Sequence, residues 1–373
     1  MVSAIVTART TTVDYSRRMP VLLDLRGAKS SDVTIGTSPI SELQACLHSL
    51  AEPDHHLDSQ SWLMKTDASL PRELRHRLTR FAPLWARRRC RLLLPLSPPL
   101  DVAVETEIDR VAHLPEQAFV EAAAYAIQGG SFDPRGAVTR PDEFIAACEA
   151  RSFSRGELAR SLTDDPEAFR GILVRTLEDS VEEFFAKEWE RIQARLRDEA
   201  DQTRSRLHGL PLAELISSVS PAARPVQDGR GVRFDKLQNL TVPLRGNHIF
   251  LVPSIHGRPH LIVRGEPGFP VVVNYPVAWR GQPPSIDEVR RRLTVLSDPA
   301  RLNLCRHMVN EAITTSDLAR RTNMTRPQVS RHLAQLRSAG LLTSERSGRY
   351  VYHRVDVQHL MQIGVELLRV IVR

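Results

Sequence analysis

The fold class predicted from the sequence is α+β: a mostly helical N-terminal domain with a small antiparallel sheet, followed by a smaller basic domain. Three observations predict it. Apolar residues recur at helical spacing over about 70–209. Short β-rich runs separated by Gly and Pro turns follow Pro211. From Ser285 to the end, 15 Arg face eight acidic residues, and the excess of 15 − 8 = 7 equals the whole net charge of +7.

The composition is that of a folded protein. Of 373 residues, 42% are hydrophobic and 25% charged, which excludes disordered, collagen-like and disulfide-scaffold chains. The length suggests two or three domains. Four widely spaced cysteines encode neither a disulfide framework nor a zinc site. No apolar run reaches the roughly 20 residues of a membrane span, and no secretion signal opens the chain, so we expect a reducing cytoplasm and no membrane partner.

The arginine excess has two explanations, since only four of the 51 basic residues are Lys. Guanidinium groups suit phosphates and base edges, and a GC-rich coding sequence also favours Arg over Lys. The location of the charge says more than its amount, because residues 1–284 hold 36 basic and 36 acidic residues. Charge concentrated in one segment indicates a nucleic-acid or membrane partner for that segment.

The N-terminal domain is expected over residues 19–275. A leader at 1–18 without helical periodicity is predicted to be disordered, and a Pro-rich linker at 276–284 ends the domain. Met19 is a second candidate start of the chain. Within the helical part, 167–207 is either one long helix or two. Two short strands are predicted at 21–25 and 33–35, a helix at 38–51 and a helical stretch at 70–209. A small antiparallel sheet is predicted from strands at 232–234, 248–252, 260–263 and 271–274.

The basic domain, 285–373, opens with three predicted helices. The first covers 285–296. Asp298 then caps the second helix, with Pro299 at its first position, and the third begins near Thr314.

A fourth helix begins at a capping box and ends at Gly340. The box is Thr325-x-x-Gln328, in which each side chain satisfies a free backbone amide of the other residue. One face of this helix is apolar, and the opposite face presents Gln328, Arg331 and Gln335; the apolar residues are Val329, Leu333 and Leu336.

Two strands, 341–346 and 350–355, then pair as a hairpin with Arg346 and Arg349 at its tip. Two short helices joined by a tight turn and followed by a basic hairpin are the arrangement of a winged helix-turn-helix domain. The second of these helices enters the major groove of DNA.

These residues resemble the ArsR-type family of bacterial winged-helix repressors over about 285–355. The matching segments are LSDPARL (296–302), DLA (317–319), VSRHL (329–333) and LRSAGL (336–341). The resemblance implies a homodimer that binds a palindromic operator. It implies DNA-facing roles for Thr325, Arg326, Gln328, Ser330, Arg331 and His332, and phosphate or minor-groove contacts for Arg346 and Arg349; the outward-facing Gln335 joins this set.

Each of these residues also has a purely structural explanation. Gln328 can serve only as a cap, Ser330 as a local hydrogen-bonding group and His332 as a packing residue. The two arginines of the hairpin, Arg346 and Arg349, can be ordinary solvated charges.

The chain departs from the metal-sensing members of that family. Those members carry paired cysteines in the third helix, where this chain has ITTSD (313–317). The spacing of Asp356, His359 and Glu366 does not match their zinc-binding pattern either. We therefore expect neither a metal nor a cofactor.

A last amphipathic helix leaves an apolar stripe uncovered, formed by Leu360, Ile363, Leu367, Leu368 and Ile371. A partner is the expected cover. In the family that the domain resembles, the first and last helices form the dimer interface, which implies interface roles for Leu293, Leu360, Ile363, Leu367 and Ile371. Docking onto the chain's own N-terminal domain is the alternative.

The N-terminal domain resembles an uncharacterised domain that precedes the winged helix in a subset of these regulators from GC-rich bacteria. The matching pieces are Ser38-Pro39 with Glu42-Leu43, His55 with Trp62, Trp189, Leu251-Val252-Pro253-Ser254 and Tyr275-Pro276. The resemblance implies a regulatory or sensory role and names no ligand.

Candidate catalytic chemistry is scarce in this domain. His55 and His56 with Asp54 and Asp58 fit a charged loop better than a metal or acid–base site. No phosphate-binding Gly loop, nucleophile elbow or zinc-hydrolase helix occurs in the sequence. We therefore expect no catalytic residues and no enzyme.

The sequence thus predicts a dimeric, sequence-specific transcription regulator, a repressor, that binds double-stranded operator DNA through its C-terminal domain. The N-terminal domain is expected to sense a small-molecule effector or a partner. Two alternatives stay open: a scaffold whose winged helix binds protein partners, and a DNA-linked enzyme with catalysis in the N-terminal domain.

Overall fold

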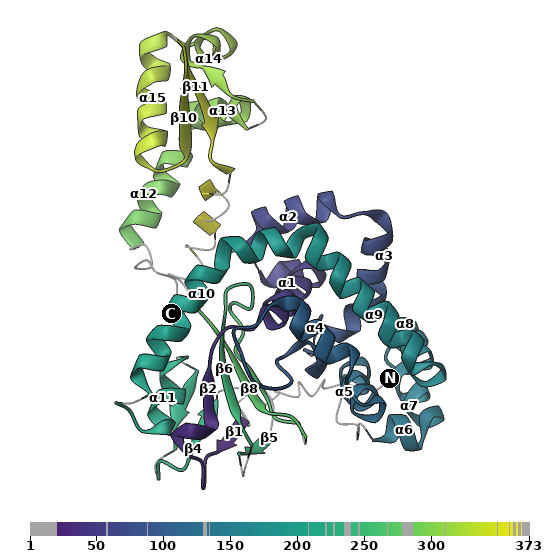
Figure 1. Ribbon diagram of the computed structural model, residues 1–373. Coiled ribbons are helices and arrows are strands. Elements are labelled where there is room, and N and C mark those ends of the chain that lie inside the picture. The colour runs from purple at the N-terminus through teal and green to yellow at the C-terminus, as the bar shows by residue number, and fades with distance from the viewer. Residues whose placement is uncertain are drawn as a thin grey trace, which may run out of the picture. The chain divides into compact units, whose positions relative to one another are not determined.

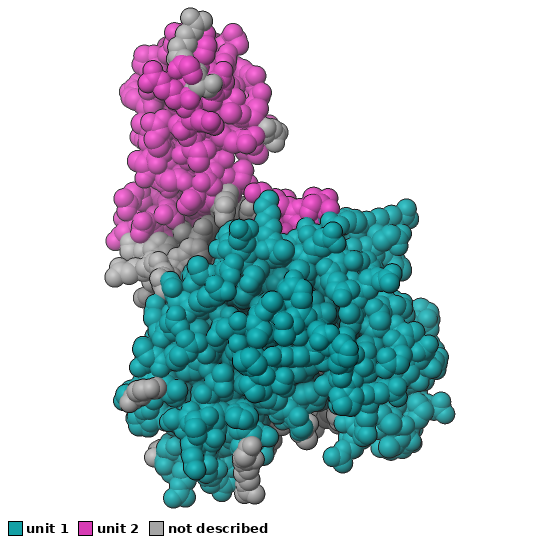
Figure 2. All heavy atoms as spheres, in the orientation of Figure 1, with its two compact units in different colours: residues 1–51, 70–277 teal, residues 52–69, 278–373 magenta. Residues whose placement is uncertain are grey.

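The structure of the chain, a computed structural model, divides into two compact units, residues 1–51 with 70–277 and residues 52–69 with 278–373 (Figure 2). The expected leader and most of the expected linker lie outside the described residues, so these domain boundaries stay predictions. The structure describes residues 21–367 apart from 57–58, 88, 130–132, 134, 208, 221, 227, 235–239, 245–246, 267, 278–285, 310, 349, 358, 361–362 and 365–366.

The first unit is mostly helical, as the sequence predicts (Figure 1). Its helices are α1 (Pro39–Ala51), α3 (Arg72–Phe81), α4 (Val104–Ala112), α5 (Glu116–Gln128), α6 (Gly136–Thr139), α7 (Pro141–Glu149), α8 (Phe153–Asp164), α9 (Pro166–Ser180), α10 (Ala186–Arg206) and α11 (Leu212–Ser218). A π-helical turn, Val181–Phe185, joins α9 to α10. The stretch that the sequence left as one helix or two is therefore one continuous helical run.

Aromatic rings fill the centre of the helical part. Phe81 of α3 and Phe119 of α5 each meet Phe169 of α9 edge to face, with ring centroids 5.3 and 6.1 Å apart. All three side chains are almost fully buried. Packing of such large rings from three helices explains the regular apolar spacing of the sequence in this region.

The strands of the first unit are β1 (Val21–Asp24), β2 (Val33–Ile35), β3 (Ala223–Pro225), β4 (Gly231–Phe234), β5 (Leu240–Pro243), β6 (Ile249–Ser254), β7 (Ile262–Arg264) and β8 (Val271–Pro276). They form two mixed sheets of four strands, with the orders β3-β4-β1-β5 and β2-β6-β8-β7. β1 is parallel to β5, and β6 is parallel to both β2 and β8. The α+β class is confirmed, but the single small antiparallel sheet that we expected is wrong.

The sheet prediction was wrong for two physical reasons. β6 and β8 are nearly continuous apolar runs with almost every side chain buried, which is the pattern of strands covered on both faces, as in parallel sheets. In addition, β1 and β2 come from the start of the chain, so that Val33 pairs with Ile249. Pairing over such a sequence distance leaves no local signal.

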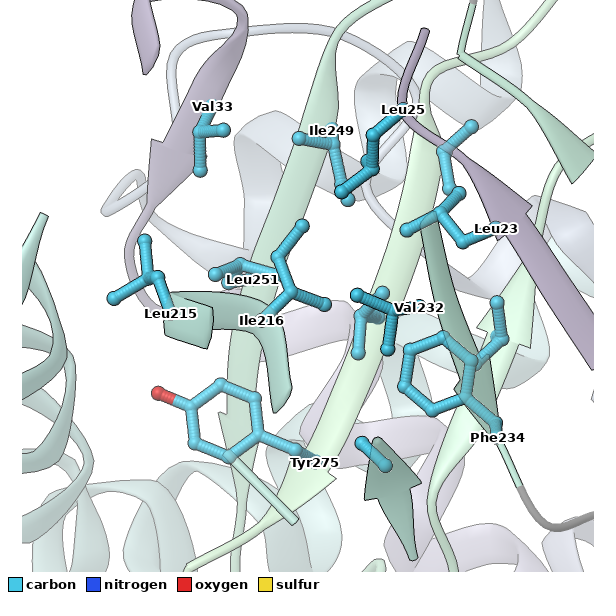
Figure 3. Packing of buried hydrophobic residues seen from close by; sticks show 14 of the residues in the cluster. Leu23, Leu25, Val33, Leu215, Ile216, Val232, Phe234, Ile249, Leu251 and Tyr275 are labelled. Carbon is cyan, nitrogen blue, oxygen red and sulfur yellow. The ribbon is translucent and has the colours of Figure 1, made fainter. Parts of the chain in front are cut away.

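One hydrophobic core is shared by the two sheets (Figure 3). Leu23 and Val232 contribute from the first sheet and Leu251 from the second, and all three are 0% exposed. Ile216 of α11 packs into the same cluster. Burial of each such side chain stabilises the fold by about 1.5–3 kcal/mol. The strand-rich part is therefore stabilised by a hydrophobic core of its own.

The second unit contains the predicted winged helix-turn-helix domain. Its elements are α2 (Gln60–Ser69), α12 (Ile286–Leu296), α13 (Pro299–Met308), β9 (Ile313–Thr314), α14 (Thr315–Thr322), α15 (Arg326–Ser338), β10 (Leu342–Ser347) and β11 (Tyr350–Val355). The three strands form one antiparallel sheet in the order β10-β11-β9, of which the sequence predicted the hairpin but not the short β9. Over the described part of the chain, no helix combines the length and apolar character needed to cross a bilayer.

Candidate nucleic-acid interface

The turn between α14 and α15 is set by local caps at both helices. Thr314 caps α14 by accepting the Asp317 amide at 3.2 Å, and Asn323 ends that helix in the left-handed region, at φ 53°. The Thr325 hydroxyl oxygen accepts the Gln328 amide at 3.4 Å, and the Gln328 side-chain oxygen accepts the Thr325 amide at 2.9 Å. The predicted capping box is therefore present.

α15 has one buried face and one exposed face. Val329, Leu333 and Leu336 are buried in the core of the unit, as the sequence predicts. His332 is half-buried. The other residues of the candidate DNA-facing set on and beside this helix are exposed: Thr325, Arg326, Gln328, Ser330, Arg331 and Gln335.

Two arginines of α15 have no polar partner within the described residues. Within the described residues, Arg326 and Arg331 make neither a hydrogen bond nor an ion pair, and α15 contains no acidic residue. In α14, by contrast, Arg320 and Arg321 each form an ion pair with an acidic side chain. Arg326 and Arg331 are thus available to an external anion, whereas Arg337 at the end of α15 donates to Ser344 and the arginines of α14 already have a carboxylate partner.

Three residues of the candidate set have structural contacts or surroundings as well. Gln328 completes the cap described above. The Gln335 side-chain oxygen accepts a hydrogen bond from Arg301 and so links α15 to α13. His332 has a buried Nδ1 without a hydrogen-bond partner among the described residues.

The predicted wing is the hairpin of β10 and β11, which pair antiparallel along their full lengths. Gly348 turns the hairpin at φ +61°, a conformation that glycine adopts without strain. Arg346 is exposed, and its Nε donates to the Gly348 carbonyl at 3.3 Å. Arg349, the other wing residue of the candidate set, lies outside the described residues.

A buried histidine that our sequence analysis missed joins the wing to α14. The Nδ1 of His353 lies 2.9 Å from the Ser344 hydroxyl, and its Nε2 lies 3.1 Å from the Thr315 hydroxyl. Burial, and then the charge of Arg337, lower the pKa of His353. Strand alternation is the signal that could have found it, because residue 353 falls on the same face as the buried Val355.

The apolar residues expected at a dimer interface differ in exposure. Leu293 of α12 is 38% exposed, and Leu360 and Leu367 are half-buried. Ile363 is 4% exposed and belongs to the hydrophobic core of its own unit, and its place at an interface stays a prediction. The half-buried Leu360 packs against the same cluster. Ile371 lies outside the described residues.

A network of buried polar side chains around α1 in the first unit was not predicted. The Glu42 carboxylate accepts hydrogen bonds from the amides of Ile255 and His256, at 3.1 and 2.7 Å. The His256 Nε2 lies 2.6 Å from a Glu188 oxygen. Burial opposes ionisation of Glu188, but the hydrogen bonds from His256 and Arg191 hold the pKa of Glu188 below its usual value.

Glu107 of α4 is a second buried carboxyl group, and it holds the start of α1. It accepts the Ser38 hydroxyl at 2.7 Å and the Ile40 amide at 2.8 Å. Burial raises the pKa of Glu107 to about 7, although these two hydrogen bonds act in the opposite direction.

The charged loop expected after Pro53 is only partly exposed. Asp54 is exposed, but His56 is 2% exposed, which differs from the solvated loop that the sequence predicts. Asp58 lies outside the described residues, as does the side chain of His55.

Comparison with known protein families matches residues 19–281 to one family, described as a family of unknown function (DUF5937). The chain belongs to this family. The matched DUF5937 region begins at Met19 and includes every element from β1 to β8. It carries the resemblance that the sequence motifs of the N-terminal domain indicate.

A second family model, a helix-turn-helix domain, matches residues 296–345, beyond the DUF5937 region. Curated relatives include the HTH-type transcriptional regulator KmtR and the HTH-type transcriptional repressor SmtB, both of Mycobacterium tuberculosis, at 28% identity over 72 residues and 32% over 81. An arsenic resistance transcriptional regulator of Pseudomonas putida is 36% identical over 87 residues. The matches cover 19%, 22% and 21% of this chain and 55%, 60% and 66% of those proteins.

Solved structures give similar matches. An ArsR-like transcriptional regulator from Rhodococcus sp. RHA1 is 26% identical, with 22% of this chain and 79% of that chain covered at a TM-score of 0.22. The homodimeric winged helix-turn-helix domain of Mb0332 from Mycobacterium bovis is 23% identical, with 25% and 91% covered at a TM-score of 0.21. The helix-turn-helix model confirms a helix-turn-helix domain in the C-terminal part of the chain, and this part is similar in sequence to the curated transcriptional regulators named above.

Proposed function

We propose that this chain is a transcription regulator that represses its target genes by binding a palindromic operator as a homodimer. The observation that carries the proposal is the surface of α15. Apart from Pro327 and Ala334, its exposed side chains are polar or cationic; it contains no acidic residue, and Arg326 and Arg331 have no partner among the described residues. Such a helix suits the major groove, where guanine offers two acceptors to one guanidinium group.

The roles of the individual residues follow from their positions. Arg326 and Arg331 bind base edges or phosphates, and the Ser330 hydroxyl donates to a phosphate oxygen. The Thr325 hydroxyl donates to the Gln328 side-chain oxygen at 2.9 Å, so Thr325 lies beside the DNA mainly as the cap of the recognition helix. Each bidentate contact between Arg and guanine discriminates against other bases by about 1–3 kcal/mol. The caps of α14 and α15 support this proposal because they hold the recognition helix in place before DNA binds, which lowers the entropy cost of binding.

The wing supplies a second set of contacts. Arg346, exposed on the hairpin, and Arg349 neutralise phosphates beside the major groove or reach into the minor groove. His353 supports the wing by joining β11 to α14 and to β10 through its two hydrogen bonds.

A palindromic operator requires two copies of the chain, each with one α15 in a major groove, about one helical turn apart. Leu293 is exposed on α12, and Leu360 and Leu367 are half-buried on the last helix. These residues, with Ile371, supply apolar surface that a second copy can cover.

The DUF5937 region is the regulatory part in this proposal and catalyses no reaction. It makes up most of the chain and has its own cores, which is the organisation of an independent domain. A ligand that binds there regulates transcription if it has different affinities for the DNA-bound and free forms.

The test is to sequence the genomic fragments that the purified full-length protein retains. We expect inverted repeats with half-site centres about 10 base pairs, or a multiple of this, apart. The double variant Arg326→Ala/Arg331→Ala is expected to retain none of them. Arg306→Ala is the matched control, since it removes an exposed arginine from α13, outside the candidate set. Fragments without a shared repeat, or equal retention by the double variant, would contradict the proposal.

A further inference from the structure

The loop after β6 in the first unit is fastened to α1 by buried hydrogen bonds. The Glu42 carboxylate accepts the amides of Ile255 and His256. About two helical turns further along α1, the Ser49 hydroxyl donates to the His256 carbonyl oxygen at 3.2 Å. Since Glu42, Ser49 and His256 are all buried, this loop has one defined position relative to α1.

The same loop turns tightly and so fixes the position of His260. The Gly257 amide donates to the Ser254 hydroxyl oxygen at 2.9 Å, and the His260 amide donates to the Gly257 carbonyl at 2.8 Å. A Cβ at Gly257 would lie 2.5 Å from the buried Ser254 oxygen, so any other residue there shifts the turn. The backbone thus positions the His260 ring before any ligand arrives.

The His260 ring faces His48 of α1. The two ring centroids are 5.4 Å apart with an interplanar angle of 77°, and one ring nitrogen of each residue lies within 4.8 Å of the other. Two Zn–N bonds of about 2.0–2.1 Å each span roughly 3.3 Å at tetrahedral geometry, so a metal ion would draw the two nitrogens closer together. His48 is buried, and His260 is half-buried beside the exposed Pro259.

The tautomer of His48 is set by the protein backbone. Its Nδ1 lies 2.9 Å from the Trp85 carbonyl oxygen, which can only accept a hydrogen bond. Nδ1 therefore carries a proton, and in the neutral imidazole Nε2 is the nitrogen that can bind a metal ion. A histidine that donates one ring N–H to a backbone carbonyl and offers its other nitrogen is the usual arrangement of a metal ligand with its supporting shell.

We propose that His48 and His260 bind a divalent transition metal ion of the zinc class within the DUF5937 region. Imidazole nitrogens suit zinc, copper, nickel and iron, whereas magnesium and calcium take oxygen ligands. Water or another ligand completes the coordination. The proposal concerns metal binding itself and does not depend on the proposed DNA binding.

The test is a titration of the full-length protein with Co²⁺, a spectroscopic substitute for zinc, followed by visible absorption. We expect one equivalent to bind with the bands of nitrogen and oxygen ligands. His48→Asn keeps a donor toward Trp85 but removes Nε2, and His260→Gln removes the second ring. Each substitution is expected to weaken binding at least tenfold. His113→Gln is the matched control, because His113 is exposed beyond α4 in the same unit and should leave binding unchanged.

Thermal unfolding with Zn²⁺ separates lost binding from lost folding. Zn²⁺ should raise the Tm of the wild type and of the His113→Gln variant but not that of the folded His48→Asn and His260→Gln variants, since a ligand stabilises only a state that binds it. The proposal is overturned if no Co²⁺ binds, if both histidine variants bind as tightly as the wild type, or if the spectrum shows thiolate ligands. None of these readouts involves DNA, so failure here and failure of operator binding are distinguishable.

Discussion

The arginines of the DUF5937 region and those of α15 differ in what they contact. Arg91 is 0% exposed and donates to the carbonyl oxygens of Pro95 and Pro270, at 2.9 and 3.1 Å. Arg170 is buried as well and donates to a backbone carbonyl. Arg326 and Arg331 of α15 are exposed and have no partner among the described residues. The difference teaches that the contacts of an arginine, and not the arginine content of the chain, indicate which residues can bind an anion.

The largest expected effect is on stability, from removal of a buried arginine. Arg91→Met should lower the free energy of unfolding by about 4 kcal/mol, because it leaves the buried carbonyl groups of Pro95 and Pro270 without this donor and removes one of the two cations beside Glu266. Urea unfolding measures this. Arg87→Ala, an exposed neighbour, is the control and should change stability by less than about 0.5 kcal/mol. If Arg91→Met is as stable as the control, the structural role of the buried arginines is wrong.

The α15 arginines should show the opposite behaviour. Arg326→Ala/Arg331→Ala should weaken binding to the chain's own promoter region by about 3–4 kcal/mol, a few hundredfold, at unchanged stability. Fluorescence anisotropy with labelled DNA measures the affinity, and urea unfolding checks the stability. A double variant that is less stable but binds DNA as tightly as the wild type would show that these two arginines serve folding and not DNA binding.

The buried carboxyl group of Glu107 should make the stability of the DUF5937 region depend on pH. Because the folded-state pKa of Glu107 is about 7, the folded chain holds a proton that the unfolded chain has lost between about pH 4.5 and 7. This contribution to stability is complete below the unfolded pKa and is lost as pH rises through 7, by about 3 kcal/mol in total. Unfolding free energies at pH 5 and pH 8 should show the loss in the wild type and not in Glu107→Gln. If the unfolding free energy changes equally between pH 5 and pH 8 in the two proteins, Glu107 is not the source of the pH dependence.

How much of the fold and of the candidate site can be predicted from the sequence depends on how far apart in the chain the interacting residues lie. The capping box of Thr325 and Gln328 and the apolar face of α15 are local patterns, and the structure confirms both. The link of Gln335 to Arg301 joins residues of two helices, and the hydrogen bonds of Glu42 to residues 255 and 256 join opposite ends of the DUF5937 region. No spacing rule reports such contacts.

The strand-rich part shows the same limit. The sequence located β6 and β8 from their apolar content, but it did not predict that they pair parallel to each other or that β6 also pairs with β2, which lies more than 200 residues earlier. The candidate metal ligands His48 and His260 are likewise brought together only by the fold. An isolated histidine in an apolar helix has no signal that separates a ligand from a packed residue.

The smallest expected effect is on the wing. Arg346→Ala should weaken DNA binding by about 0.5–1 kcal/mol for all sequences alike and reduce the salt dependence of binding by about one unit of slope. Arg354→Ala, exposed on β11 away from the tip, is the control. A change in sequence preference in place of a uniform loss would assign Arg346 to base contacts.

The measurement that tests the central claim most directly is the affinity of the full-length protein for its own promoter DNA across a series of salt concentrations. The account predicts that the logarithm of the affinity falls linearly with the logarithm of salt concentration, with a slope of about −0.9 for each phosphate neutralised. It also predicts a shallower slope for Arg326→Ala/Arg331→Ala and an unchanged one for Arg306→Ala. Absence of binding, affinity independent of salt, or the same slope and affinity in the double variant would contradict it.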